Sequence, residues 1–177
     1  MTCLYLGATA ETGPEALAPI GECLSAAFRL PVRQVELPDV EFAFDRERGQ
    51  YASIPVLEML ARIHRGGGGK LMGVTGRDLF IPVLTFVFGH AQLGGSVALV
   101  SLARLRQEFY GLERNHEVFL ERARKEALHE AGHTFGLVHC AERSCAMSLS
   151  TNVQQIDRKR ACFCADCTAQ LRKGVRT

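Results

Sequence analysis

Five residues in the second half of the chain, His129, Glu130, His133, Gly136 and His139, have the spacing H-E-x-x-H-x-x-G-x-x-H. On a helix, residues four positions apart share a face, so the rings of His129 and His133 project together. Gly136 permits a left-handed turn, which brings His139 back toward them. Three imidazoles with an open fourth position suit catalytic zinc, and Glu130 is placed to take a proton from the metal-bound water. We therefore expect a catalytic zinc site here.

A second set of metal-ligand residues follows at once. Cys140 and Cys145 form one short-spaced pair, and Cys164 and Cys167 form a C-x2-C pair. Four thiolates close a tetrahedral zinc site and make it structural, so we expect a second zinc ion per chain. Cys162 leaves a pairing of 162 with 164 open, and free thiols are the alternative to a metal. The usual knuckle spacing favours 164 with 167.

The first two histidines need a helix to hold them. Asn115 is a plausible N-cap, and no proline interrupts the run that follows. Apolar residues recur every fourth position and predict a buried stripe, made of Phe119, Ala123, Ala127, Ala131 and Phe135. We expect this helix to end at Gly136.

The upstream half has the pattern of an α/β protein. Apolar runs predict strands at 3–7, 32–37, 70–74, 84–88 and 96–102, with helices around 17–28 and from Ser53 onward. The β-α-β opening favours a mixed, mainly parallel five-stranded twisted sheet. The 79–88 segment, which contains the 84–88 strand, follows the third strand by too short a link for a helical crossover, so we expect it to run antiparallel along an edge. The 38–51 segment is expected to be a loop.

Composition limits the remaining possibilities. A chain of 177 residues with 47% hydrophobic residues predicts one domain, with a sheet and active-site helix in 1–139 and a small Cys-rich subdomain in 140–177. A formal charge of +2 gives no reason to expect nucleic acid or a membrane as partner. No signal peptide or membrane span is evident, so we expect a cytoplasmic monomer.

Three further features are expected to be ordinary. His90 is assigned a surface or core role, although the edge strand would place it near the cleft. Glu126 either orients a ligand histidine or lies on a solvated helix face. The cluster Arg158, Lys159 and Arg160 is expected to be solvated.

The run H-E-A-G-H-T-F-G-L-V-H-C, followed by C-A-M and C-A-D-C, resembles the archaemetzincins, a branch of the metzincin zinc peptidases. The resemblance implies a metzincin-like zincin fold. It implies that the three histidines bind catalytic zinc, that Glu130 is the general base, and that the four cysteines hold the second zinc. It also implies that Met147 is the Met-turn residue beneath the metal, and that the edge strand Leu84–Phe88 binds peptide substrate by strand addition.

The function expected on these grounds is zinc-dependent hydrolysis of peptide bonds, with aminopeptidase action on short peptides as one form. Some metzincins carry a tyrosine after the Met-turn, but Tyr5, Tyr51 and Tyr110 all precede the motif here. A low-activity, zinc-stabilised protein-interaction module and a hydrolase of a non-peptide amide therefore stay open. Because Cys140 follows His139 directly, we also expect the cysteine-bound zinc to fix His139.

Overall fold

The computed structural model describes residues 3–174. Its main sheet has five strands in the order β2-β1-β5-β9-β8, all parallel except β8, which runs antiparallel to β9. The strands are β1 (Leu4–Ala8), β2 (Val32–Glu36), β5 (Lys70–Thr75), β8 (Gly89–Ala91) and β9 (Val97–Ser101). The prediction of a mainly parallel five-stranded sheet is confirmed.

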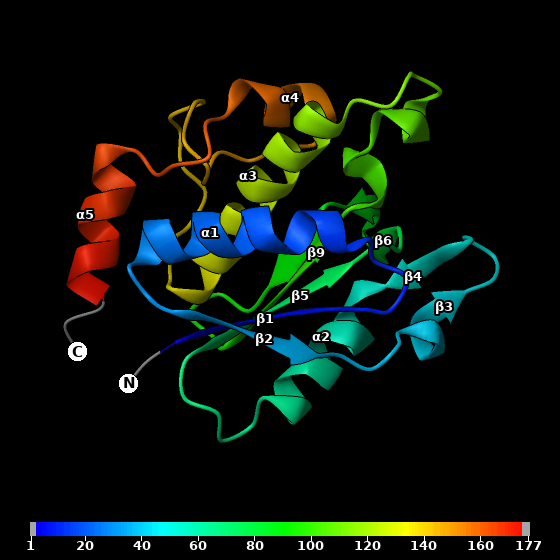
Figure 1. Ribbon diagram of the computed structural model, residues 1–177, viewed down its shortest axis with the longest axis horizontal. Coiled ribbons are helices and arrows are strands. Elements are labelled where there is room, and N and C mark those ends of the chain that lie inside the picture. The colour runs from blue at the N-terminus through cyan, green and yellow to red at the C-terminus, as the bar shows by residue number, and fades with distance from the viewer. Residues whose placement is uncertain (1–2, 175–177) are drawn as a thin grey trace.

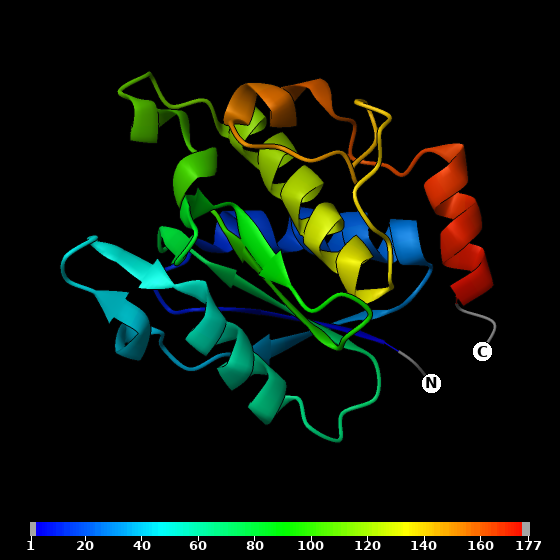
Figure 2. The ribbon, with the colours of Figure 1, turned by 180° about the vertical axis from the view of Figure 1, so that it is seen from behind.

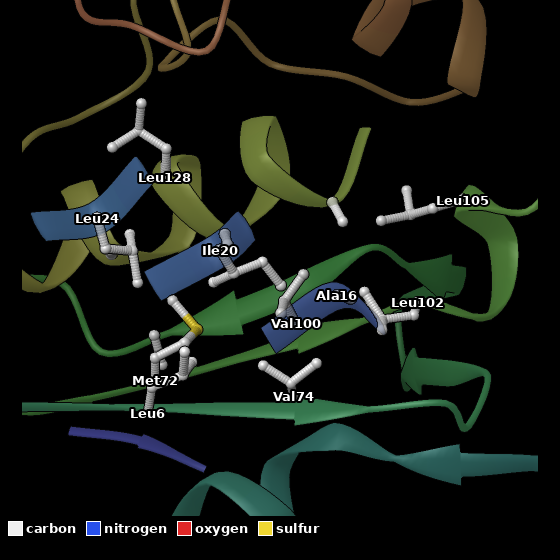
Figure 3. Packing of buried hydrophobic residues seen from close by; sticks show 14 of the residues in the cluster. Leu6, Ala16, Ile20, Leu24, Met72, Val74, Val100, Leu102, Leu105 and Leu128 are labelled. Atoms are coloured by element: carbon white, nitrogen blue, oxygen red, sulfur yellow. The ribbon is translucent and has the colours of Figure 1, made fainter. Parts of the chain in front are cut away.

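Helices cover both faces of this sheet. Helices α1 (Leu17–Phe28) and α3 (His116–Thr134) lie on one face, and α2 (Ser53–Ile63) lies on the other (Figures 1 and 2). Strand side chains alternate between the faces, so Leu6 and Val100 join the core beneath α1 and α3, while Leu71 and Leu99 join the α2 side. Figure 3 shows Leu6 and Val100 packed with Ile20 of α1 in the larger core. This two-sided burial explains the near-continuous apolar strands.

The region between β2 and β8 contains a second sheet that the sequence did not predict. Its order is β3-β4-β6-β7, with strands β3 (Phe44–Asp45), β4 (Gln50–Ala52), β6 (Leu79–Ile81) and β7 (Leu84–Val87). The 38–51 segment is therefore not only a loop, because it supplies a short helical turn (Glu41–Ala43) and two strands. Strands of two or three residues are too short to show an alternating pattern.

The antiparallel edge strand lies one segment later than expected. Leu84–Phe88 was predicted as the edge of the main sheet, but β7 pairs with β6 at an edge of the second sheet. Strand β8 is the antiparallel edge of the main sheet instead. Its residues, Gly-His-Ala, have little intrinsic strand preference, which explains why the pattern ended at Phe88.

Helix α3 follows two 3-10 turns (Ala103–Leu105 and Gln107–Tyr110) and begins as predicted. The Asn115 side chain accepts a hydrogen bond from the Val118 N–H at 3.1 Å. The helix ends at Thr134, two residues before Gly136, which adopts the left-handed conformation with φ 85°. The N–H groups of Gly136 and Leu137 donate to the carbonyls of His133 and Gly132 and close the last turn.

The C-terminal segment crosses α3 and then turns back beside α1. Helix α4 (Val153–Arg158) packs on α3, and α5 (Ala165–Gly174) lies at the left in Figure 1, next to the C-terminal end of α1. Residues 175–177, the end of the expected Cys-rich subdomain, lie outside the described residues. Within 3–174, no helix has the length and apolar character needed to span a bilayer.

Candidate metal centres and cleft

The three motif histidines converge at the C-terminal end of α3. Their candidate ligand nitrogens all lie within 4.8 Å of one another. His129 and His133 project from successive turns, and the turn at Gly136 brings the ring of His139 to within 5.3 Å of the His129 ring centroid. The structure therefore brings His129, His133 and His139 together, as expected from their spacing.

Backbone carbonyls fix the tautomers of two of these rings. The Nδ1 of His129 lies 2.8 Å from the Ala146 carbonyl oxygen, and the Nδ1 of His133 lies 2.7 Å from that of Leu137. Because a carbonyl oxygen only accepts, each Nδ1 must carry the proton and donate it. Each Nε2 is then left with a lone pair for a metal.

The spacing of these nitrogens suits a bound zinc ion. The Nε2 atoms of His129 and His133 lie 3.1 Å apart, with two lone pairs facing each other. Zinc–nitrogen bonds of 2.0–2.1 Å in a tetrahedron give a separation of about 3.3 Å. Burial lowers the pKa of His129 well below its usual value, so the neutral, metal-binding form is favoured. The three histidines therefore fit zinc.

Glu130 lies on the same helix against the edge strand. It is 6% exposed, and burial raises its pKa well above the usual range, with Glu126 adding to the effect and Lys159 opposing it. A Cβ atom on Gly89 of β8 would lie only 2.4 Å from the Glu130 Cγ. Gly89 thus lets the edge strand approach the Glu130 side chain, a role that its sequence context did not reveal.

A cleft of about 520 Å³ opens above these residues. Its floor is α3, one wall is the continuous segment 84–91, and the other is formed by Val138, His139 and residues 149–151. Leu84 and Leu149, on opposite walls, are each more than half exposed. His90 lines the cleft, but its Nδ1 is bound to the buried Ser53 hydroxyl at 2.9 Å, on the α2 side of the sheet. The lining contains all three histidines and Glu130.

Met147 lies beneath the histidine-bearing turn of α3. It is fully buried, and a Cβ atom on Gly132 would come within 2.4 Å of its sulfur. Gly132, between Glu130 and His133 in the motif, is therefore small because methionine occupies the space beside it. Met147 therefore packs directly against the turn that carries His133.

Four cysteine sulfurs form the second cluster. Cys140, Cys145, Cys164 and Cys167 place their Sγ atoms within 4.8 Å of one another, whereas Cys162 is exposed and outside the group. The Cys140–Cys164 and Cys145–Cys167 Sγ distances are both 3.8 Å. Zinc–sulfur bonds of 2.3 Å in a tetrahedron give about 3.8 Å, far longer than a disulfide.

Backbone N–H groups face these sulfurs. Cys164 N–H donates to the Cys145 Sγ at 3.3 Å, and Glu142 N–H donates to the Cys140 Sγ at 3.4 Å. The N–H of Cys167 lowers the pKa of Cys164. Donors aimed at sulfur stabilise thiolates, the form in which cysteine binds zinc. The cluster therefore fits a closed, four-thiolate zinc site.

Comparison with known proteins decides the family. Residues 20–173 match the model of peptidase family M54. The chain belongs to this family. It is 42% identical over 144 residues to the archaemetzincin of Methanopyrus kandleri, a match that covers 81% of this chain and 77% of that protein. It is 39% identical over 145 residues to the archaemetzincin of Archaeoglobus fulgidus, covering 82% and 81%.

Solved structures agree with the M54 assignment. The crystal structure of the M. kandleri archaemetzincin superposes with a TM-score of 0.86 at 36% identity, covering 99% of this chain and 96% of that one. A zinc-dependent peptidase from Methanocorpusculum labreanum gives 0.87 at 33% identity, covering 95% and 99%. The resemblance to the archaemetzincins and the expected fold are confirmed. This M54 member is a zinc metallopeptidase, a hydrolase.

Proposed function

We propose that the chain hydrolyses peptide bonds with a water molecule activated between the three histidines and Glu130. The observation that carries this proposal is the convergence of His129, His133 and His139 beside Glu130 in the cleft. Zinc held by these histidines supplies the Lewis acidity that activates water and polarises the scissile carbonyl. The remaining steps belong to the chain's own residues.

Glu130 acts as the general base. Its carboxylate faces the cleft, and a buried carboxylate holds a proton more readily than an exposed one. Glu130 takes the proton from the attacking water and passes it to the nitrogen of the leaving amine. The carbonyls of Ala146 and Leu137 hold the rings of His129 and His133 in the required tautomer throughout.

The substrate is proposed to bind as an extra strand along β8. Ser101 N–H donates to the Phe88 carbonyl and Gln92 N–H donates to that of Val97, so Phe88, His90 and Gln92 face β9. In an antiparallel ladder the alternate residues, Gly89 and Ala91, point their backbone groups away from the partner strand. The proposed strand-addition edge is thus Gly89–Ala91, and the 84–88 segment expected for this role continues the same wall.

The four-cysteine cluster is proposed to hold a second, structural zinc ion. Each chain then carries two zinc ions, one open to substrate and one closed. None of the seven cysteines, all of which lie within the described residues, forms a disulfide, which suits a reducing compartment such as the cytoplasm. The small size of the cleft, about 520 Å³, suits short peptides, and both aminopeptidase and endopeptidase action are compatible with it.

The test is hydrolysis of a peptide library by the zinc-loaded wild type, by Glu130→Ala, and by Glu117→Ala, which removes an exposed carboxylate from the same helix. We expect activity in the wild type and the Glu117 variant, and its loss in Glu130→Ala. Equal rates in the wild type and Glu130→Ala would disprove the role of Glu130. No hydrolysis by any of the three would favour the interaction module, and cleavage of acyl-amides alone in a parallel panel would favour the non-peptide hydrolase.

A further inference from the structure

A ladder of buried charged residues runs along α3 toward Glu130. Arg122, Glu126 and Glu130 are spaced four apart, so they share one helix face, and they are only 5%, 3% and 6% exposed. The segment around α4 covers the first two. Arg122 forms a two-pronged ion pair with Asp157, with both nitrogen–oxygen distances 2.7 Å.

The second rung is a fully buried ion pair. The Lys159 Nζ lies 3.0 Å from Glu126 Oε1, and the two side chains are 1% and 4% exposed. The expectation that Lys159 is solvated was therefore wrong. The backbone N–H of Lys159 donates to the Ile156 carbonyl at the end of α4. The Lys159 side chain points inward there, while Arg158 and Arg160 stay exposed.

Stability alone does not account for this pair. Removing a lysine and a glutamate from water costs several kcal/mol per ion, and a buried pair is often replaced by neutral side chains without loss of stability. Glu126 also lines the cleft, one helical turn before Glu130. Within residues 3–174, Lys159 forms its salt bridge with Glu126, and Glu130 forms none.

We propose that Lys159 and Glu126 are positioning residues for Glu130. Glu126, one helical turn before Glu130, holds the Lys159 ammonium in place. The positive charge of Lys159 then orients the Glu130 carboxylate without forming a direct salt bridge with it. The same ammonium offsets the negative charge of Glu126, which would otherwise repel Glu130 along the helix. This inference rests on the proposed role of Glu130 as the base.

The electrostatics of the site agree with this geometry. The pKa of Glu130 is raised by burial and by Glu126, and Lys159 acts against both. The pKa of Glu126 is likewise raised by burial and lowered by Lys159. Among the described residues, Lys159 is the cation within salt-bridge distance of Glu126, and Glu126 lies one helical turn from Glu130.

The test compares Lys159→Met, which breaks the pair, with Lys159→Met/Glu126→Gln, which removes both charges with little change in shape. We expect the single variant to lower both Tm and kcat, because it leaves Glu126 buried and unpaired. The double variant is expected to regain a Tm near that of the wild type while its kcat stays about 10- to 100-fold low, with KM little changed. Lys159→Arg, which keeps the charge, is expected to keep most of kcat.

Recovery of wild-type kcat in the double variant would show that the pair is structural only and would overturn the proposal. Zinc content is measured for each variant, to separate loss of the base from loss of metal. If Glu130→Ala were as active as the wild type, the proposed function itself would fail. If Glu130→Ala were inactive but the double variant were fully active, only the positioning role of Lys159 and Glu126 would be rejected. A crystal structure of the zinc-loaded double variant adds a readout without substrate, since an unchanged Glu130 rotamer would also reject it.

Discussion

The Nδ1 of His129 donates to the carbonyl of Ala146 at 2.8 Å, and Ala146 lies between Cys145 of the thiolate cluster and Met147 beneath α3. Cys145, Ala146 and Met147 thus link the cysteine cluster to the helix that carries His129 and His133. The Cys140 N–H donates to the Met147 carbonyl at 3.0 Å and closes the loop between them. The hydrogen bond between His129 and Ala146 links the cysteine cluster to a histidine ring by a side-chain contact, whereas His139 and Cys140 are only neighbours in the sequence.

We therefore predict that emptying the cysteine site weakens the histidine site. Cys164→Ser is expected to lose the structural zinc and to raise the zinc dissociation constant of the histidine site about 10- to 100-fold, because the outer-shell carbonyl of Ala146 is no longer fixed. Chelator competition with zinc counting measures both sites. Cys162→Ser, at the exposed neighbouring cysteine, is the matched control, and unchanged affinity in Cys164→Ser would contradict the coupling.

Gly89→Ala is expected to damage the catalytic side chain directly. The new Cβ would lie 2.4 Å from the Glu130 Cγ, so the edge strand or the carboxylate must move. We predict a stability loss of about 1–3 kcal/mol and a kcat lower by about 10- to 100-fold. Gly68→Ala, where nothing lies within 4 Å of the new atom, is the control. Thermal unfolding and peptide hydrolysis report both effects, and a fully active Gly89→Ala would refute the close approach.

Acid is expected to weaken metal binding and destabilise the fold. Burial lowers the pKa of His129, His133 and His139 below the unfolded value of about 6.5. At pH values just below about 6.5, the unfolded chain therefore binds more protons than the folded protein. Stability contributed by the neutral rings is present above pH about 6.5 and is lost as the pH falls through their folded pKa values. The free energy of unfolding and the zinc content, followed from pH 7.5 to 5, should fall together, whereas an increase in stability on acidification would contradict this prediction.

Thiol labelling should separate the cysteines into classes. Burial raises the pKa of Cys23 to about 11, which leaves almost no reactive thiolate near neutral pH, whereas Cys162 is exposed. In zinc-loaded protein at pH 8, iodoacetamide is expected to modify Cys162 well before Cys23 or the four clustered cysteines. A strong chelator should then expose Cys140 and Cys164. Mass spectrometry of the modified peptides checks this order, which early labelling of Cys164 would contradict.

The sequence predicted the parts of the site that depend on local spacing. His129 and His133 share a face because an α-helix forces residues four apart together, and Asn115 and Gly136 signal the two ends of that region by their own backbone chemistry. The C-x2-C spacing likewise favoured Cys164 with Cys167 over Cys162 with Cys164, and the structure brings the sulfurs of Cys164 and Cys167 together in one cluster. These are short-range rules, and they hold whatever surrounds the segment.

Long-range features were not predictable in the same way. The side chain of Lys159 turns inward because α4 ends beside α3, and nothing in the run Arg-Lys-Arg distinguishes the middle cation. Strand β8 is held by its pairing with β9 rather than by its own residues, so its position at Gly89–Ala91 was missed. The second sheet was missed because its strands β3, β4 and β6 have only two or three residues, too few for an alternating pattern.

The connection from the thiolate cluster to His129 passes through a main-chain carbonyl. Every amino acid at position 146 supplies that oxygen, so alanine scanning cannot delete the contact, and natural sequence variation at this position leaves it in place. Chemical synthesis can alter it: replacing the amide between Ala146 and Met147 with an ester makes the carbonyl a weaker acceptor while both side chains remain. The contact that joins the cysteine cluster to His129 therefore depends on the course of the backbone and not on the type of side chain at position 146.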